Sequence, residues 1–149
     1  MGREVEMSER KVAVVTGSAT GVGAATVLGL ARRGYDVVIN YTKSEVEAAA
    51  SAAACAEAGA DTLVVRADVA DDAACRGMVG AAVERWGRID ALVNNAGRTS
   101  VASMAGWEGF DAQVFHDIYA VNLIGPFQMI RACAPELTKA KGAIVNVSS

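Results

Sequence analysis

Short apolar runs that alternate with longer helical patterns constrain the fold of this chain more than any other feature. Five of these runs are rich in β-branched residues and carry no charge: Val12–Val15, Val37–Ile39, Leu63–Val65, Ala91–Val93 and Ala143–Val145. Strands that are buried on both faces of a parallel sheet are apolar at every position. The runs therefore predict five parallel strands with helices between them.

The segments between the runs carry signals for helix starts and stops. Ser44 and Glu47 have the spacing of a capping box ahead of an alanine-rich helix, and Asp71 opens the third helix. A fourth helix is predicted from about Asp111 toward Lys139. A glycine that can end the helix follows each of the first three, at Gly34, Gly59 and Gly87.

This order of elements predicts one α/β domain. Right-handed crossovers turn a β-α-β-α-β-α-β-α-β order into an open, doubly wound parallel sheet. The chain has 149 residues, 52% of them hydrophobic and 21% charged, which is the composition of one folded domain. We expect a flexible N-terminal extension at residues 1–10 and the folded domain at residues 11–149.

Composition argues against several classes of function. The net charge is −3 and no basic cluster occurs, so nucleic-acid binding is not expected. Cys55, Cys75 and Cys133 are scattered, which is typical of reduced thiols in a cytoplasmic protein. The first ten residues lack the apolar core of a signal peptide, and the alanine-rich stretch is too weakly apolar to span a membrane. We expect neither a membrane partner nor a metal site.

A glycine-rich loop, Thr16–Gly23, joins the first predicted strand to the first helix with the spacing T-G-x-x-x-G-x-G. Glycines there permit a tight turn and let the backbone approach a pyrophosphate, whose charge meets the free N–H groups of the helix. The spacing differs from G-x-G-x-x-G and from a P-loop, which requires Gly-Lys-Ser/Thr. By itself the loop is also compatible with a plain tight turn.

Five motifs in this order resemble the short-chain dehydrogenase/reductase superfamily in its ordinary, non-extended branch. They are the glycine-rich loop, Asp68-Val69, Asn94-Asn95-Ala96-Gly97, Asn122 within Val121–Gly125, and the closing Asn146-Val147-Ser148-Ser149. The set looks loosely like that of 3-oxoacyl-acyl-carrier-protein reductases. The resemblance covers the N-terminal part of such an enzyme and implies a Rossmann-like sheet with strand order 3-2-1-4-5.

The resemblance also implies cofactor contacts. In the glycine-rich loop, the residues expected to wrap the pyrophosphate and the adenosine ribose are Gly17, Ser18, Thr20, Gly21, Val22 and Gly23. Those expected along the adenine, the ribose and the rest of the cofactor are Asp68, Val69, Asn95, Ala96, Gly97 and Ser148. Asn94 would brace the central strands. Without the family pattern, Asp68 could equally be an ordinary loop carboxylate, and the asparagine motif a plain turn.

The end of the second strand predicts the type of nicotinamide cofactor. NAD enzymes usually place an acid there to hold the ribose 2′-hydroxyl. This chain has Tyr41, Thr42, Lys43 and Ser44 instead, followed by a helix N-terminus, and these groups favour a bound phosphate. NADP(H) is therefore expected over NAD(H). Thr20 is a departure, because many NADP-dependent members carry Arg or Lys at this position.

The resemblance implies carbonyl–alcohol interconversion, with Ser149 orienting the carbonyl and Asn122 as a further catalytic residue. Pro126 has no N–H to donate to the Asn122 carbonyl, so a kink is expected there. The family's Tyr-x-x-x-Lys acid/base pair follows the serine and is absent from these residues. The 149-residue chain alone is therefore expected to be inactive, and the full protein to be longer.

A missing C-terminal part would leave surfaces uncovered. The fifth strand would be an open edge, and the fourth helix would expose Phe127, Met129 and Ile130. In the family this helix lies at the main dimer interface, so a homodimer or homotetramer is expected. The resemblance also places substrate selection in Arg98–Phe110, where Trp107 and Phe110 could line the cleft mouth or simply pack.

Two other functions stay open. One is a non-catalytic dinucleotide-binding module or sensor. The other is a methyltransferase-like domain, which would favour an acid where Tyr41 stands. The expected substrate is a small carbonyl or alcohol compound of unspecified identity.

Overall fold

The computed structural model describes residues 9–101 and 109–148. These residues form a five-stranded sheet in which every neighbouring pair is parallel. The strand order is β3-β2-β1-β4-β5, which confirms the predicted doubly wound topology. The strands are β1 (Lys11–Val15), β2 (Tyr35–Tyr41), β3 (Thr62–Arg66), β4 (Ala91–Asn94) and β5 (Ala143–Asn146).

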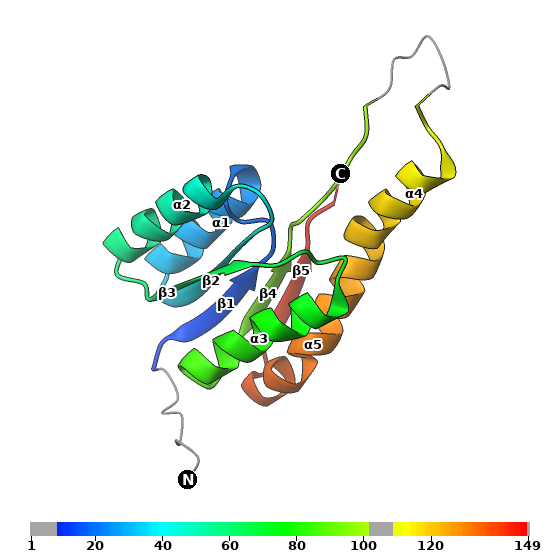
Figure 1. Cartoon of the computed structure of the whole chain (residues 1–149). Coiled ribbons are helices and arrows are strands. Elements are labelled where there is room, and N and C mark those ends of the chain that lie inside the picture. Colours follow the sequence, from blue (N-terminus) through cyan, green and yellow to red (C-terminus); the bar gives the residue numbers. More distant parts are fainter. Residues whose placement is uncertain (1–8, 102–108, 149) are drawn as a thin grey trace.

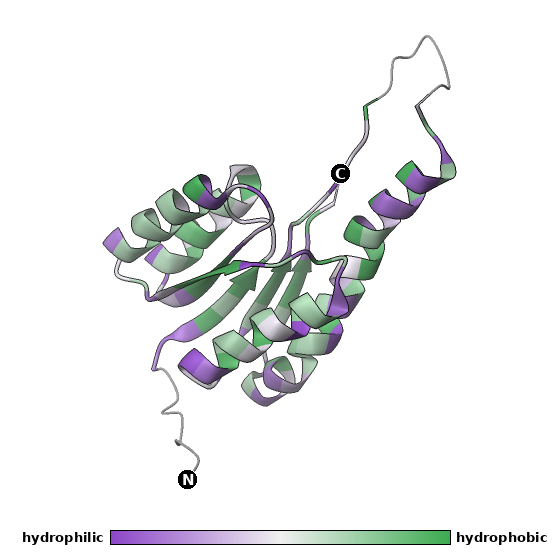
Figure 2. Ribbon diagram, in the orientation of Figure 1, coloured by the Kyte–Doolittle hydropathy of each residue, from purple (hydrophilic) through white to green (hydrophobic). Residues whose placement is uncertain are grey.

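Helices cover both faces of this sheet (Figure 1). One apolar core joins β1 and β2 to α1 (Gly21–Arg32) and α2 (Glu45–Glu57). The other core joins the opposite face to α3 (Asp72–Trp86) and α5 (Gly125–Ala140). In Figure 2 the central strands are coloured as hydrophobic between these two helical layers.

Burial follows the position of each strand in the sheet. β1, β2 and β4 are buried over most of their length, as their continuous apolar runs predicted. β3 lies at one edge and is only partly buried. β5 lies at the other edge with all four residues exposed, in agreement with the predicted open edge.

The predicted helix ends are largely confirmed. Gly34, Gly59 and Gly87 have φ values of 88°, 87° and 70°, a left-handed conformation that favours glycine. The Asp71 carboxylate accepts hydrogen bonds from the N–H groups at the start of α3. The capping box at Ser44 was wrong, because its side chain makes no capping hydrogen bond. The backbone turns there instead, and Glu45 N–H donates to the Lys43 carbonyl.

The predicted fourth helix is three consecutive segments rather than one α-helix. α4 (Ala112–Tyr119) leads into a π-helical segment, η1 (Ala120–Ile124), and then into α5. The N–H of Gly125 donates to the Ala120 carbonyl, five residues back. Pro126 directly follows, so the predicted irregularity near it takes the form of a π-helical turn.

The predicted exposure on α5 was right for one residue of three. Phe127 is 58% exposed, whereas Ile130 is half-buried. Met129 is fully buried, so the prediction for it was wrong. Met129 shares a helix face with Cys133 and Leu137, and this face packs into the core against α3.

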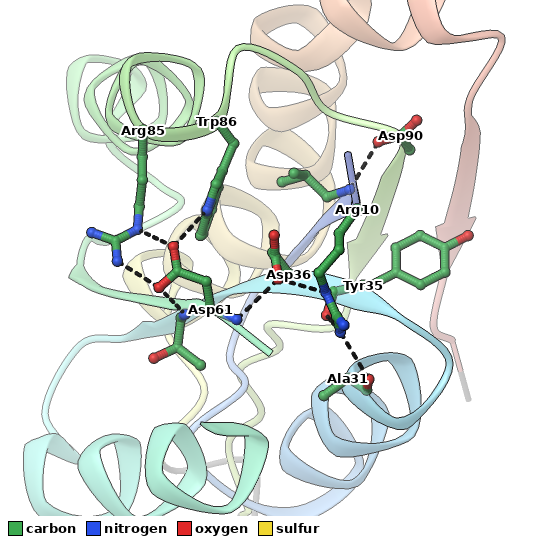
Figure 3. Close-up of polar contacts among 10 residues, drawn as sticks. Arg10, Ala31, Tyr35, Asp36, Asp61, Arg85, Trp86 and Asp90 are labelled. Carbon is green, nitrogen blue, oxygen red and sulfur yellow. Dashed lines mark hydrogen bonds and ion pairs between the residues drawn. The ribbon is translucent and has the colours of Figure 1, made fainter. Parts of the chain in front are cut away.

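The amino ends of the strands carry carboxylates held by arginines (Figure 3). Asp36 is buried, pairs with Arg10 at 2.9 Å, and accepts from the N–H of Asp61 at 2.9 Å. The Asp61 carboxylate accepts from Arg85 and, at 2.8 Å, from Trp86 Nε1. These bonds tie the start of β2 to the residues around β3 and to the end of α3.

The interactions of Asp61 predict that the stability of the fold decreases at acidic pH. The hydrogen bond from Arg85 holds the pKa of the Asp61 carboxyl below its usual range, and the Trp86 hydrogen bond acts in the same direction. A carboxyl whose pKa is lowered by folding stabilises the fold above its unfolded pKa of about 3.9. That stabilisation is lost as the pH falls through the folded pKa. We expect Asp61→Asn to lower the urea midpoint of unfolding at neutral pH. The decrease of that midpoint toward acidic pH should also be smaller in the variant than in the wild type. Parallel plots of urea midpoint against pH for the two proteins would contradict this.

Candidate functional site

Two adjoining cavities lie at the carboxyl ends of the strands. Their volumes are about 680 Å³ and about 730 Å³, within the range of small-molecule sites. Both are lined by the loop that follows β4, at Asn95, Ala96, Gly97 and Arg98. Ligands of doubly wound sheets bind at this edge, near the point where the strand order reverses.

The first cavity brings together most of the predicted cofactor residues from four separate loops. Those that line it are Gly17, Thr20, Tyr41, Thr42, Lys43, Ser44, Asp68, Val69, Asn95, Ala96 and Gly97. Four other predicted residues, Ser18, Gly21, Val22 and Gly23, are not among its lining residues. Gly21 and Val22 are exposed in the first turn of α1, whereas Ser18 and Gly23 are buried beneath the loop.

The second cavity contains predicted catalytic and cofactor residues. Asn122 and Ser148 line it, together with Leu123, Pro126 and Val147. Ser149 lies outside the described residues, as do Trp107 and most of the N-terminal extension. The predicted substrate segment is described only at its two ends, at residues 98–101 and 109–110.

Close packing requires glycine at two positions of the loop after β1. Gly17 has a φ of 61°, and a Cβ atom there would lie 2.9 Å from the Ala96 Cα. A Cβ atom on Gly23 would overlap the Gly17 carbonyl oxygen and lie 2.6 Å from Asn95 Nδ2. The loop is therefore held against the segment after β4 with no room for side chains.

The N-terminus of α1 adjoins the first cavity. Thr20, its N-cap residue, makes no side-chain capping hydrogen bond, and the first turn carries no acidic residue. Unsatisfied N–H groups and the positive end of the helix dipole favour an anion at such a position. Together with the glycine-lined approach, this arrangement matches the requirements of a pyrophosphate.

Thr16 and Asn95 fasten the loops after β1 and β4 to each other. The Thr16 hydroxyl oxygen accepts from the N–H groups of Asn95 and Ala96, both at 3.0 Å. The Asn95 side chain donates in return to the Thr16 and Gly17 carbonyls, also at 3.0 Å. Asn95 thus acts on the cavity by fixing the shape of its floor.

Asn40 is a structural residue of the site that the sequence analysis missed. It is 1% exposed, and its Oδ1 accepts from the N–H of Gly17 at 3.0 Å. Its Nδ2 donates to the Ala67 carbonyl at 2.9 Å. One amide therefore links the loops after β1 and β3 across β2. The sequence did contain a signal for this role, because Asn40 is a polar residue directly after the apolar run of the second strand.

Ser18 belongs to the same buried network. Its hydroxyl donates to the Val15 carbonyl at 2.8 Å and accepts from the Asn40 N–H at 3.0 Å. Ser18 is fully buried, so its side chain holds the loop in shape and does not face the cavity.

The Asn122 side chain holds the backbone of Arg98 on both sides. Its Oδ1 accepts from the Arg98 N–H at 2.7 Å, and its Nδ2 donates to the Arg98 carbonyl at 2.9 Å. The Arg98 guanidinium pairs with Asp117 on α4 at 2.9 Å. The π-helical segment is thereby fastened to the loop that the two cavities share.

Asn94 joins the ends of β4 and β5 beside the second cavity. Its Nδ2 donates to Asn146 Oδ1 at 2.9 Å, which connects the ends of β4 and the edge strand β5. The residue is 4% exposed, and its Oδ1 has no hydrogen-bond partner among the described residues.

The three cysteines are free and buried. Burial raises the pKa of the Cys75 thiol to about 11 and that of Cys133 to about 12. Both thiols are therefore protonated at neutral pH. Because only the thiolate form is a nucleophile, neither cysteine is expected to act as one. His116 is exposed on α4.

None of the helices within the described ranges combines the length and the apolar character needed to cross a membrane.

Comparison with known proteins decides the family. The family model described as short chain dehydrogenase matches residues 11–149, which is nearly the whole chain. This chain belongs to the short-chain dehydrogenase family. The strand order and the glycine-lined loop of the chain agree with that membership.

Among curated sequences, "Granaticin polyketide synthase putative ketoacyl reductase 2" of Streptomyces violaceoruber is 42% identical over 142 residues. The 3-oxoacyl-(acyl-carrier-protein) reductase FabG of Staphylococcus aureus is 35% identical over 144 residues. These alignments cover 95% and 96% of the chain but 55% and 57% of the relatives. The chain thus spans a little over half the length of these relatives.

Among solved structures, the NADH-dependent reductase A1-R′, responsible for alginate metabolism, is 31% identical with a TM-score of 0.84. The match covers 94% of this chain and 58% of that one. Relatives of this fold therefore include an enzyme named for NADH, so the choice between NADH and NADPH depends on the residues of each site.

Proposed function

We propose that this chain forms the dinucleotide-binding part of an oxidoreductase that interconverts a carbonyl and an alcohol, with NADP(H) preferred. The observation that carries the proposal is the first cavity, which the loops after β1, β2, β3 and β4 surround. The close contacts at Gly17 and Gly23 fix the β1 loop at the start of α1, where the positive end of the helix favours a pyrophosphate.

Different groups of residues would bind different parts of the dinucleotide. The loop Gly17–Gly23 and the start of α1 would hold the pyrophosphate, and Asp68 with Val69 would hold the adenine. Asn95–Gly97 would line the ribose, with Ser148 against the nicotinamide half. The bound cofactor supplies the hydride. The chain's own residues bind and orient it, and Asn40 and Ser18 keep the loop in the required shape.

The second cavity is the proposed place of the carbonyl substrate. Ser148 lines it, and Ser149, which directly follows, is proposed to orient the carbonyl oxygen. Asn122 acts as a positioning residue in this proposal, since its side chain is engaged with the Arg98 backbone. We further propose a cytoplasmic protein, because its three cysteines are free.

Exposed aromatic residues on the outer helices support a homodimer or homotetramer. Phe115 and Tyr119 on α4 and Phe127 on α5 are each more than half exposed. Contiguous exposed apolar surface commonly marks a protein–protein contact. Analytical ultracentrifugation of the full-length protein would test this part of the proposal.

Steady-state kinetics of the full-length protein tests the function. We expect oxidation of NADPH in the presence of small carbonyl compounds, followed at the absorbance of the reduced nicotinamide. The competing function is a non-catalytic dinucleotide-binding module. Stoichiometric NADPH binding without turnover of any carbonyl in a broad panel would support that module and contradict the enzyme.

Lys43 gives a direct test of the preferred cofactor. Lys43 lines the first cavity just after the end of β2, where no acid occurs. We expect Lys43→Gln to weaken NADPH binding about tenfold, because one charge-assisted contact with the 2′-phosphate is lost. Binding of NADH should change by less than about twofold, since it lacks that phosphate. Fluorescence titration measures both affinities.

Lys11→Gln is the matched control for this test. Lys11 is exposed at the amino end of β1, at the opposite edge of the sheet from the cavity. The control removes the same charge and should leave both affinities unchanged. Equal weakening of NADPH and NADH by Lys43→Gln would contradict a contact with the 2′-phosphate.

A further inference from the structure

Arg66 differs from the other described arginines in how its charge is balanced. Arg32 and Arg33 stand at the C-terminal end of α1, where the helix dipole favours a cation. Six others form ion pairs with aspartates: Arg10, Arg76, Arg85, Arg88, Arg98 and Arg131. Across residues 9–101 and 109–148, no carboxylate pairs with Arg66. Instead its Nε donates to the carbonyl of Thr42 at 3.2 Å.

The position of Arg66 places this charge beside the first cavity. Arg66 is the last residue of β3 and lies opposite Tyr41, the last residue of β2. Its hydrogen bond reaches the next residue, Thr42, which lines the cavity together with Lys43. Ala67 and Asp68, which directly follow Arg66, line the cavity as well. The side chain thus spans from one wall-forming segment to the other.

We propose that Arg66 is a specificity-determining residue that acts with Lys43 to favour a phosphate on the 2′ position of the bound dinucleotide. This inference rests on the proposed dinucleotide-binding function. Arg66 acts in two ways: its Nε fixes the segment that carries Lys43, and its charge adds to the positive potential at the end of β2.

Lys43 lines the first cavity and Arg66 directly precedes the lining residues Ala67 and Asp68, and among the described residues neither cation has a carboxylate partner. Such an arrangement favours a bound anion. Both charges would attract a phosphate bound near the end of β2. The guanidinium uses only Nε in its described contact, so its terminal N–H groups can donate to phosphate oxygens. The 2′-phosphate is the group by which NADP(H) differs from NAD(H), so this charge affects the choice between them.

Acidic residues near Arg66 and Lys43 limit how strongly these two cations favour a 2′-phosphate. Glu45 and Glu47 lie in the first turn of α2, close in sequence to Lys43, and like Arg66 they are not among the residues that line the cavity. Asp68 lines it, and one of its carboxylate oxygens accepts from the N–H of Ala70 at 2.9 Å. We therefore expect an effect comparable with that of a single charge-assisted contact.

Substitution of Arg66→Gln in the full-length protein tests the inference, with NADPH and NADH titrated separately by fluorescence. We expect NADPH binding to weaken about tenfold and NADH binding to change by less than about twofold. Added salt should reduce the difference in NADPH affinity between wild type and variant, because exposed charges are screened, and it should not affect their NADH affinities. Arg33→Gln removes the same charge at the far end of α1 and should change neither affinity.

Each result discriminates between explanations. Equal weakening of both cofactors would mean that Arg66 only holds Thr42 in place, and this would overturn the inference, as would no change in either affinity. Wild-type protein that binds neither cofactor would contradict the proposed function itself. Should Arg66→Gln fail to fold, Arg66→Lys retains the charge without the guanidinium fork. It should keep a preference for NADPH over NADH, and complete loss of that preference would contradict the charge-based role.

Discussion

Gly23→Ala is expected to abolish detectable dinucleotide binding and to destabilise the fold by about 3 kcal/mol, the upper part of the usual range for overpacking. The added methyl group would overlap the Gly17 carbonyl and crowd Asn95 Nδ2 and the Ser18 Cα. Two of these three obstacles are backbone atoms, which cannot move as a flexible side chain can. The first turn of α1 would have to move away from Gly17 and Ser18 at the start of the loop, and the first cavity would lose its shape there. NADPH titration and thermal unfolding measure the two effects.

Gly29→Ala is a matched control within the same helix. A Cβ atom on Gly29 would meet no atom within 4 Å, so the substitution introduces no contact. Alanine is favoured over glycine inside a helix by about 1 kcal/mol. We therefore expect a small increase in the unfolding temperature and unchanged NADPH binding. A Gly23→Ala protein as stable as Gly29→Ala, with normal affinity, would show that the loop packs differently from the arrangement described here.

Asn40→Ala should have the second largest effect, a loss of about 2–4 kcal/mol in the free energy of unfolding. The estimate follows from two backbone groups left without partners, each costing about 1–2 kcal/mol, the lower part of the range for buried groups because the Gly17 N–H is only partly buried. These groups are the Gly17 N–H and the Ala67 carbonyl. Because Gly17 would lose its anchor, NADPH affinity should fall as well. Urea unfolding and NADPH titration provide the two measurements.

Gln113→Ala removes an amide of similar chemistry from an exposed helix. Gln113 lies on α4 and donates to Asp117 at the surface. Surface changes of this kind usually alter stability by less than about 0.5 kcal/mol. Similar unfolding midpoints for Asn40→Ala and Gln113→Ala would contradict the proposed role of Asn40 as a link between the loops.

The general fold could be predicted from sequence because its signals are local. Continuous apolar runs identify β1, β2 and β4 as buried parallel strands, and glycines such as Gly34 and Gly87 end the helices by adopting positive φ. The position of the glycine-rich loop could also be predicted, because only one strand-to-helix turn in the sequence has that spacing of glycines. These features depend on neighbours along the chain.

Other features depend on contacts between segments far apart in sequence. Ser18 belongs to the glycine-rich loop, yet its hydroxyl is used by Asn40, twenty-two residues away. Met129 lies on an amphipathic helix, but which side faces the core depends on how α5 packs against α3. The π-helical turn before Pro126 is one of several ways in which a helix accommodates a missing N–H. None of these outcomes is encoded in local spacing.

The carboxylate–arginine bonds around Asp36 and Asp61 lie at the opposite edge of the sheet from both cavities. A protein with this layout can gain thermal resistance without disturbing its binding chemistry, because the two properties depend on separate sets of residues. Directed evolution for heat tolerance should therefore accumulate its accepted substitutions around the amino ends of the strands. It should leave the loops at the carboxyl ends unchanged, and the usual trade-off between robustness and activity should be weak in this family member.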